Sequence, residues 1–309
     1  MSEFVARYLK DYRPSDFSIK TVDLTFELDD TKTQVTSVLS INKENNAAQQ
    51  LSLNGEHITL IDIFYNERKL APTEYSVTET GVNLSIPDEQ CTLTIITEID
   101  PANNTSLEGL FKSGGAFCTQ CEAEGFRRIT YYLDRPDVMA IFTTKVIADK
   151  TLYPYLLSNG NKVDSGNLDN NRHFVSWEDP FPKPCYLFAL VAGDFDLLAD
   201  KYTTGSGKDV CLEIFVDKGN KHKAEHAMAS LKHSMRWDED TFGLEYDLGI
   251  YMIVAVDFFN MGAMENKGLN VFNSKFVLAD KETATDTDYF NVEAVIAHEY
   301  FHNWTGNRV

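Results

Sequence analysis

The stretch from Thr285 to His302 reads TDTDYFNVEAVIAHEYFH and decides how the C-terminal part of the chain folds. It begins with Thr285-Asp286-Thr287-Asp288, a capping pattern for a helix start, and its apolar residues then recur at helical spacing. Gly306 offers a stop, so the pattern predicts an α-helix of about five turns. On such a helix His298 and His302 lie one above the other on the same face, so both imidazoles can reach one metal ion.

The helix ends in His298-Glu299-Tyr300-Phe301-His302, an HExxH motif of the kind found in zinc peptidases. Glu299 lies beside the histidines, where its carboxylate can act as the general base that takes a proton from zinc-bound water. A catalytic zinc usually has three protein ligands, and only residues 303–309 follow His302. We therefore expect the third ligand to lie beyond the chain end. The alternative is a pair of structural histidines on an amphipathic helix.

A second motif, Met261-Gly262-Ala263-Met264-Glu265-Asn266, lies upstream of this helix. The apolar runs 250–256 and 269–278 predict buried strands, so residues 262–268 form a bend between them. A peptide laid along such an edge can be held by main-chain hydrogen bonds, which leaves Glu265 to meet a charged terminus. A carboxylate there would select a free α-ammonium group. The alternative is a solvated acid in an ordinary turn.

The two motifs together resemble the GxMEN and HExxH motifs of the M1 metalloaminopeptidases, specifically the bacterial aminopeptidase N (alanyl aminopeptidase) branch. The resemblance runs from near the N-terminus to the end of the chain. It includes the segments 118–126, 131–137 and 181–186, which read CTQCEAEGF, YYLDRPD and FPKPCY. It implies a zinc-dependent aminopeptidase that releases N-terminal amino acids from peptides, with one Zn²⁺ per chain bound by His298 and His302.

The resemblance also implies which residues of the second motif bind substrate. Glu265 would bind the free amino group of the peptide. Gly262 and Ala263 would line the peptide-binding edge, and Met264 and Asn266 complete the motif. In this interpretation Glu265 turns a peptidase into an aminopeptidase.

Residues elsewhere in the chain complete the expected substrate pocket. Glu122 matches a second family carboxylate that shares the substrate amine, and Gln120 lies beside it. Two acids around one ammonium group favour a charged amine and disfavour an acetylated one. Met261 matches a position that shapes the pocket for the first side chain, although a methionine beside a strand usually just packs.

The end of the chain departs from the family pattern. The family completes its zinc site with a later glutamate and stabilises the transition state with a later tyrosine, and both positions lie beyond Val309. We therefore expect the chain to be the N-terminal portion of a longer enzyme. Two histidines alone bind zinc more weakly and less selectively than two histidines and a glutamate. The 309-residue chain by itself is expected to have little or no peptidase activity.

Residues 1–194 are expected to form an all-β N-terminal domain of sandwich or saddle type that contributes to the substrate pocket. The expected strands lie at 22–28, 35–41, 58–64, 91–99, 140–148, 173–177 and 186–192. Ser158-Asn159-Gly160-Asn161 predicts a hairpin turn. Residues 195–309 are expected to form the first, incomplete part of an α+β domain, which the resemblance identifies as thermolysin-like.

The composition of the chain indicates which classes of binding partner and which cellular compartment to expect. The formal charge of −19 argues against nucleic-acid or anionic-membrane partners. Residues 1–20 are mixed and charged, so we expect no signal peptide or membrane anchor, and a cytoplasmic monomer. The five cysteines are an odd number without framework spacing, which suits reduced thiols. Cys118 and Cys121 form a CxxC pair that lacks the setting of a redox or zinc site.

A third motif, His222-Lys223-Ala224-Glu225-His226, spells the inverted zinc motif HxxEH on a predicted helix from about 221 to 242. Lysines crowd this motif with positive charge. The apolar stripe of the helix runs instead through Ala227, Leu231, Met235 and Trp237. We therefore expect solvated histidines beside a packed face.

Two other functions stay open at this point. One is hydrolysis of a different bond, as in epoxide-opening relatives, which usually carry a glycine where this chain has Ala263. The other is a non-catalytic module that binds peptide N-termini through Glu122 and Glu265 without turnover. Stoichiometric zinc and release of a chromogenic amine would exclude the second.

Overall fold

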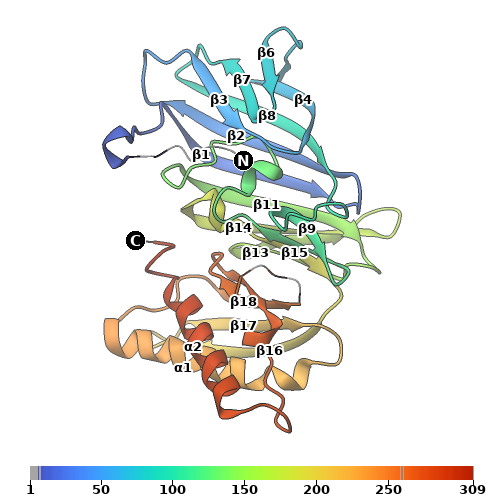
Figure 1. Cartoon of the computed structure of the whole chain (residues 1–309), viewed down its shortest axis with the longest axis vertical. Coiled ribbons are helices and arrows are strands. Elements are labelled where there is room, and N and C mark those ends of the chain that lie inside the picture. The colour runs from blue at the N-terminus through green and yellow to red at the C-terminus, as the bar shows by residue number, and fades with distance from the viewer. Residues whose placement is uncertain (1–5, 7, 258, 260, 309) are drawn as a thin grey trace.

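The computed structural model describes residue 6, residues 8–257, residue 259 and residues 261–308. The outer ends of the two expected domains, Met1 and Val309, lie outside these residues. Figure 1 shows an upper body of β-sheets above a smaller body in which helices α1 and α2 accompany a further sheet. The predicted fold class, β-sheets followed by a mixed α and β segment, is confirmed. The division between residues 194 and 195 stays a prediction.

An eight-stranded sheet runs through the upper body in the order β13-β14-β11-β1-β2-β8-β4-β5. Its strands are β13 (Asn161–Asn167), β14 (Arg172–Pro184), β11 (Met139–Asp149), β1 (Phe17–Glu27), β2 (Thr33–Lys43), β8 (Gln90–Ile99), β4 (Thr59–Tyr65) and β5 (Arg68–Lys69). Successive side chains of a strand point to opposite faces, and in β1 Val22, Leu24 and Phe26 are accordingly buried in one core. The apolar alternation therefore predicted β1, β2, β4, β8, β11 and the first part of β14, but neither β13 nor β5.

Two smaller sheets complete the upper body. The three-stranded sheet consists of β3 (Gln50–Asn54), β7 (Gly81–Ser85) and β6 (Tyr75–Thr78), and the four-stranded sheet of β12 (Tyr155–Ser158), β15 (Leu190–Gly193), β10 (Ala116–Gln120) and β9 (Gly109–Ser113). The 3-10 helices are η1 (Leu9–Asp11), η2 (Phe126–Arg128), η3 (Cys185–Leu187), η4 (Lys221–Lys223) and η5 (Ser274–Phe276).

Two sequence predictions for this body are wrong. The turn at Ser158–Asn161 joins β12 to β13, but β12 pairs with β15 and β13 pairs with β14, so no hairpin forms. Turn residues reverse the chain without fixing which strands pair. The expected strand at 186–192 begins instead inside the helix η3, and the strand β15 starts only at Leu190. An apolar run describes burial and does not by itself separate a strand from a short helix.

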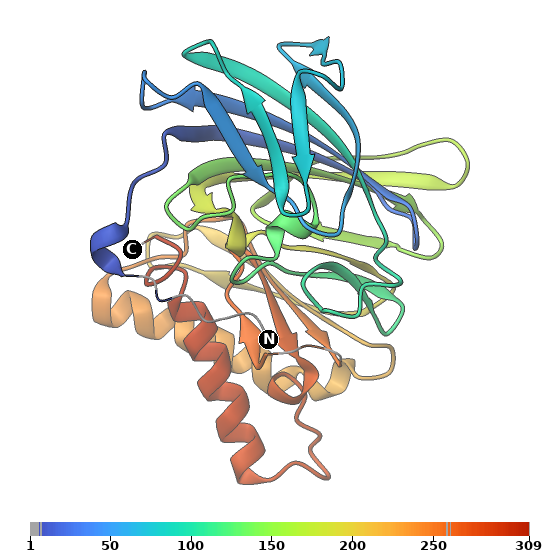
Figure 2. The ribbon, with the colours of Figure 1, turned by 45° about the horizontal axis from the view of Figure 1, so that its top comes forward.

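The lower body contains a five-stranded sheet, ordered β16-β17-β18-β20-β19. Its elements are β16 (Asp196–Thr203), β17 (Asp209–Val216), β18 (Ile250–Val256), β20 (Leu269–Asn273) and β19 (Ala263–Met264), with α1 (Glu225–Phe242) and α2 (Asp286–Phe301). Both faces of the sheet are covered: Ile214 and Ile253 share a core with the two helices, whereas Phe215 and Val254 share one with the four-stranded sheet. Figure 2 shows the two helices together on the side away from the upper body.

The predicted strand at 269–278 is shorter than expected, because β20 ends at Asn273 and η5 follows.

Among the described residues, no helix is long and apolar enough to span a membrane.

Candidate active site

Helix α2 carries the HExxH motif and is fixed at its start by a capping box. The Asp288 amide donates to the Thr285 hydroxyl at 3.3 Å, and the Thr285 amide donates to the Asp288 carboxylate at 2.8 Å. The buried residues of the helix are Val292, Ile296, Glu299 and Tyr300. They fix its rotation, and the helix ends at Phe301 with His302 at its C-cap. It is therefore slightly shorter than predicted.

The two histidines of the motif face one point in space. The Nε2 atoms of His298 and His302 lie 3.0 Å apart. The Nδ1 atom of His302 donates to the Thr305 carbonyl at 2.7 Å, which leaves the lone pair of Nε2 facing the site. Gly306 makes this possible, because its φ is +126° and a Cβ there would lie 2.7 Å from His302 Nδ1. The pair fits a metal ion bound through both Nε2 atoms.

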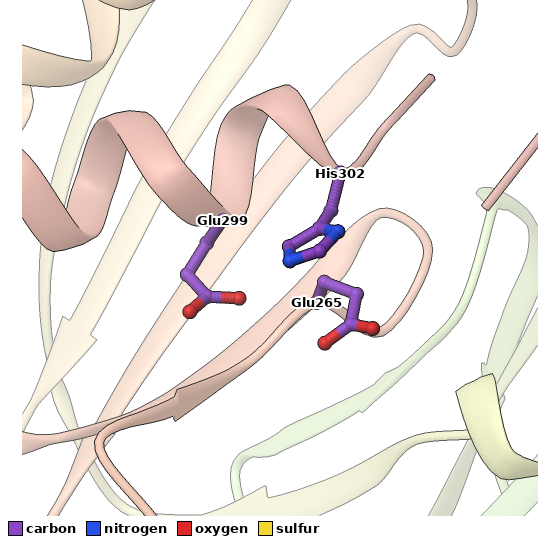
Figure 3. Close-up of side chains that lie close together, drawn as sticks. All are labelled: Glu265, Glu299 and His302. Atoms are coloured by element: carbon purple, nitrogen blue, oxygen red, sulfur yellow. The ribbon is translucent and has the colours of Figure 1, made fainter. Parts of the chain in front are cut away.

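Glu299 lies beneath the histidines in a site that is rich in negative charge. It is 6% exposed, and its Oε2 atom has no hydrogen-bond partner among the described residues. Burial, reinforced by the carboxylates of Glu265 and Glu122, raises the pKa of Glu299 to about 8. Potential ligand atoms of Glu265, Glu299 and His302 all lie within 4.8 Å of one another. Figure 3 shows the three side chains pointing into a common space.

Strand β19 places Glu265 at the edge of the five-stranded sheet. Ala263 and Met264 pair antiparallel with β20, and the other side of β19 pairs with no described strand. Glu265 follows directly and is half-buried, and its carbonyl accepts a hydrogen bond from Asn307 Nδ2 at 3.0 Å. The predicted bend at 262–268 thus contains a short edge strand that the sequence pattern did not indicate.

Residues from the upper body reach the same place. Gln120, the last residue of β10, is 1% exposed, and its Nε2 atom donates to the Met261 sulfur at 3.0 Å. Glu122 is half-buried. Burial raises its pKa, and so does the nearby Glu265, whereas His302 lowers it. The structure therefore brings the residues predicted from three separate segments together, and their roles stay predictions.

Two residues of the second motif lie behind the site. Met264 is fully buried in the core that joins the two bodies. Asn266 is 1% exposed, and its carbonyl accepts from the Leu269 amide and from Asn270 Nδ2, both at 3.0 Å. The Met264 side chain packs behind the edge strand and the main-chain carbonyl of Asn266 holds the following loop, whereas Met261 and Gly262 are exposed.

Tyr186 also belongs to this site, although no pattern in the sequence indicated it. It is half-buried, and burial, Glu265 and Glu122 raise the pKa of its hydroxyl. An aromatic residue in an apolar run carries no signal of its position, so only the fold could reveal it. Thr305 was missed for the same reason, because its role depends on a main-chain carbonyl.

The inverted motif at 222–226 packs helices and does not join the site. His226 Nε2 lies 2.9 Å from the Tyr289 carbonyl, and the two rings meet edge to face at 4.8 Å. His222 is exposed as expected, but His226 is therefore a packed residue. Trp237 is 50% exposed, so its place in the predicted apolar stripe is wrong. All five cysteines are free thiols.

Comparisons with known proteins agree with the motifs. The family model described as "Peptidase M1 N-terminal domain" matches residues 14–187, and the one described as "Peptidase family M1 domain" matches residues 226–309. The chain is 62% identical to aminopeptidase N of Escherichia coli over 304 residues, which covers 98% of this chain and 35% of that protein. It is 58% identical to aminopeptidase N of Haemophilus influenzae, again over 98% of this chain and 35% of the relative.

A solved structure shares the fold. The crystal structure of Legionella pneumophila aminopeptidase A in complex with aspartic acid matches with a TM-score of 0.93 and 36% identity. The match covers 98% of this chain and 36% of that one. The chain thus spans about a third of the length of the relatives it matches, at 35% and 36%.

Proposed function

The chain belongs to peptidase family M1, and on that premise we propose that it carries the substrate-binding edge and the histidine ligands of a zinc-dependent aminopeptidase. The substrates are peptides with free N-termini. The reaction is hydrolysis of the first peptide bond, which releases the N-terminal amino acid. The relatives named aminopeptidase N support this assignment.

One observation carries the proposal: ligand atoms of Glu265, Glu299 and His302 lie within 4.8 Å of one another, with Glu122 close enough to raise the pKa of Glu299. Carboxylates crowded in a half-buried site repel each other and are stabilised when cations arrive. A metal ion at the histidines and an ammonium group at Glu265 and Glu122 would supply that positive charge. A metallo-aminopeptidase needs both.

The donor set fits zinc, which binds imidazole nitrogen and carboxylate oxygen. His298 and His302 would hold it through Nε2, and the family resemblance places a third ligand, a glutamate, beyond residue 309. When bound, zinc supplies a Lewis acid that acidifies water and polarises a peptide carbonyl. The Thr305 carbonyl keeps His302 in the tautomer that can bind, because it accepts from Nδ1 at 2.7 Å.

Glu299 is the proposed general base. Its Oε2 atom has no partner among the described residues and is therefore free to accept a proton from water. Without bound cations its pKa of about 8 keeps this group largely protonated at neutral pH, so the positive charge of the metal and of the substrate amine would be needed to leave it as the carboxylate that accepts the proton. Burial raises this pKa most, and the proposed amine-binding acids Glu265 and Glu122 raise it further, so the arriving substrate would also act on Glu299.

The open edge of β19 is the proposed peptide-binding surface. A substrate strand can add to this edge through main-chain hydrogen bonds, with its N-terminus at Glu265. Glu265 and Glu122 would then accept hydrogen bonds from the ammonium group, which an acetylated N-terminus cannot donate in the same way. Gln120 and Met261 would contact the first side chain. We further propose a cytoplasmic monomer, in line with five free thiols.

The test is a chimaera in which residues 1–309 of this chain replace the matching part of the Escherichia coli relative. Zinc content and turnover of alanyl p-nitroanilide and of its N-acetylated form would be measured, for the chimaera and for its Glu265→Gln variant. We expect one zinc, turnover of the free amine only, and a loss of this discrimination in the variant.

The same assay separates the alternative of a non-catalytic module. Binding of alanyl peptides without zinc and without release of p-nitroaniline would support that module and overturn the proposal. Equal turnover of the two substrates by the parent chimaera would contradict the assignment of Glu265.

A further inference from the structure

The side chain of Lys267, two residues after Glu265, is 2% exposed and carries a buried charge. Its ammonium group donates to both carboxylate oxygens of Asp247, at 2.7 and 2.9 Å, and to Asn303 Oδ1 at 2.7 Å. The ring of Phe181 lies 5.0 Å from the same nitrogen. Three donors meet three acceptors, so the ammonium group is fully satisfied.

The bond to Asn303 joins the two halves of the site. Asn303 follows His302 directly, and its main-chain N–H donates to the Tyr300 carbonyl at 3.0 Å. Lys267 thereby ties the loop of Glu265 to the end of the helix that carries the histidines. A second tie runs the other way, from Asn307 Nδ2 to the Glu265 carbonyl at 3.0 Å.

Lys267 is also anchored on the upper body. Its carbonyl accepts from Asn159 Nδ2 at 2.9 Å, and Asn159 is 2% exposed. Phe181, which belongs to β14, lies against Lys267 and also 4.1 Å from the guanidinium of Arg308, which pairs with Asp247. The segments that meet at this one side chain therefore come from the upper body, from the edge loop and from the end of α2.

An aminopeptidase needs a fixed spacing between the group that binds the amine and the group that acts on the carbonyl, because the amine and the carbonyl belong to the same substrate residue and only its Cα atom separates them. Glu265 and His302 lie on different elements, so neither element alone sets this spacing. A buried cation with three acceptors resists displacement, since any shift leaves a buried charge incompletely paired. Interactions of this kind are what hold a site to the accuracy that catalysis demands.

We propose that Lys267 is a positioning residue that sets the distance between the amine-binding Glu265 and the metal-binding His302. The proposal rests on the function proposed above and names the residue that gives the site its exopeptidase spacing. Lys267 itself touches neither the substrate amine nor the metal. Its effect is expected only on ligands that occupy both ends of the site at once.

Lys183 is a matched control. It is also 2% exposed, pairs with a buried carboxylate at 3.0 Å, and lies 4.0 Å from an aromatic ring. Its partners are Asp179 and Phe142, and no described bond joins it to the edge loop or to α2. Replacing either lysine by methionine removes a buried cation. Only Lys267→Met cuts the hydrogen bond from the edge loop to Asn303, since Lys183 Nζ makes no hydrogen bond to the described residues.

The experiment measures binding of two hydroxamates to the zinc-loaded chain by calorimetry. Acetohydroxamate has only the metal-binding group, whereas L-alanine hydroxamate also carries the amine. The Kd of acetohydroxamate divided by the Kd of L-alanine hydroxamate reports how well one ligand reaches both ends of the site, because the second contact is intramolecular. For the unmodified chain we expect L-alanine hydroxamate to bind about tenfold more tightly or better, as an added charge-assisted contact provides.

We expect Lys267→Met to reduce this ratio about tenfold while the Kd of acetohydroxamate changes less than about threefold. Lys183→Met should keep the ratio of the unmodified chain. Asn303→Leu cuts the same hydrogen bond without removing a charge and should behave like Lys267→Met. If Lys267→Met does not fold, the result for Asn303→Leu decides the question.

Each other outcome overturns a defined statement. A ratio near one in the unmodified chain overturns the proposed function, and this inference with it. A normal ratio in that chain, kept by both Lys267→Met and Asn303→Leu, overturns the positioning role alone. Equal losses in Lys267→Met and Lys183→Met also overturn it, because they would reflect general destabilisation.

Discussion

Glu299 combines burial, an oxygen without a hydrogen-bond partner in the described part of the chain, and neighbouring acids, which is the environment that tunes a carboxyl group for proton transfer. We predict that Glu299→Gln in the Escherichia coli chimaera lowers kcat by about 10² to 10⁴-fold, the usual contribution of a general base. Glutamine has the same shape but does not accept the proton, so zinc content should stay unchanged. Turnover of alanyl p-nitroanilide and metal analysis check this. An unchanged kcat would assign the base to another group.

Asp238 on α1 offers a test of buried charge in a pocket whose lining also includes His298. It is 1% exposed, its Oδ2 atom has no partner among the described residues, and burial raises its pKa from 3.8 to about 6. The folded state therefore holds its proton to higher pH than the unfolded state. The contribution of protonated Asp238 to the free energy of unfolding is complete below pH ~4 and is lost as the pH rises through about 6.

We predict that Asp238→Asn removes this pH dependence. As the pH rises from ~4 to ~7, the unmodified chain should lose about 2 kcal/mol of unfolding free energy relative to the variant. Urea unfolding at several pH values measures it. Asp240→Asn, at an exposed position of the same helix, is the control and should follow the unmodified chain at every pH. Parallel curves for all three proteins would contradict the prediction.

The turn after α2 is expected to influence how tightly the HExxH helix binds a metal. Gly306 has a φ of +126°, and a Cβ there would lie 2.7 Å from the Nδ1 atom that orients His302. We predict that Gly306→Ala lowers zinc affinity about 10 to 100-fold, because outer partners of metal-binding histidines typically contribute that much. Calorimetric titration of the chain with zinc measures the change.

Gly243 provides the matched control for this prediction. It ends α1 with a φ of +67°, and no heavy atom of the described residues lies within 4 Å of a Cβ built on it. Gly243→Ala therefore adds the strain of a left-handed alanine at a helix end without touching the site. It should reduce stability and leave zinc affinity unchanged. A similar loss of affinity in both variants would mean that helix strain alone explains the effect.

The core that joins the two bodies is expected to make them unfold together. Phe215 is 1% exposed and meets the ring of Tyr155 from the four-stranded sheet at 5.1 Å. We predict that Phe215→Ala costs about 3 to 5 kcal/mol, the usual range for a buried phenylalanine. Urea unfolding followed by far-UV and near-UV circular dichroism should show one transition at lower urea.

The control for this variant is Phe290→Ala. Phe290 is 71% exposed on α2, so its truncation removes little buried surface and should change stability by less than about 0.5 kcal/mol. Two separate transitions in the Phe215→Ala protein would contradict cooperative unfolding and assign independent stability to each body.

Local patterns predicted much of the fold. The capping residues Thr285 and Asp288 and the strand at 250–256 were predicted correctly, because each depends on neighbouring residues and on burial. The hairpin at Ser158–Asn161 was wrong because strand pairing is a long-range property. Trp237 was misplaced because helical spacing alone does not define the edge of a buried stripe.

By itself, the sequence determined the chemistry of the site, because HExxH spacing on a helix places two imidazoles and a carboxylate together whatever else the chain does. Tertiary structure alone decided how Glu122, Glu265 and His302 meet, since they lie on three segments that only sheet packing brings within reach. It also decided the place of Lys267, whose partners Asp247, Asn303 and Phe181 are distant in sequence. Side-chain spacing within one element is fixed by backbone geometry, whereas distances between elements are fixed only by the packed core.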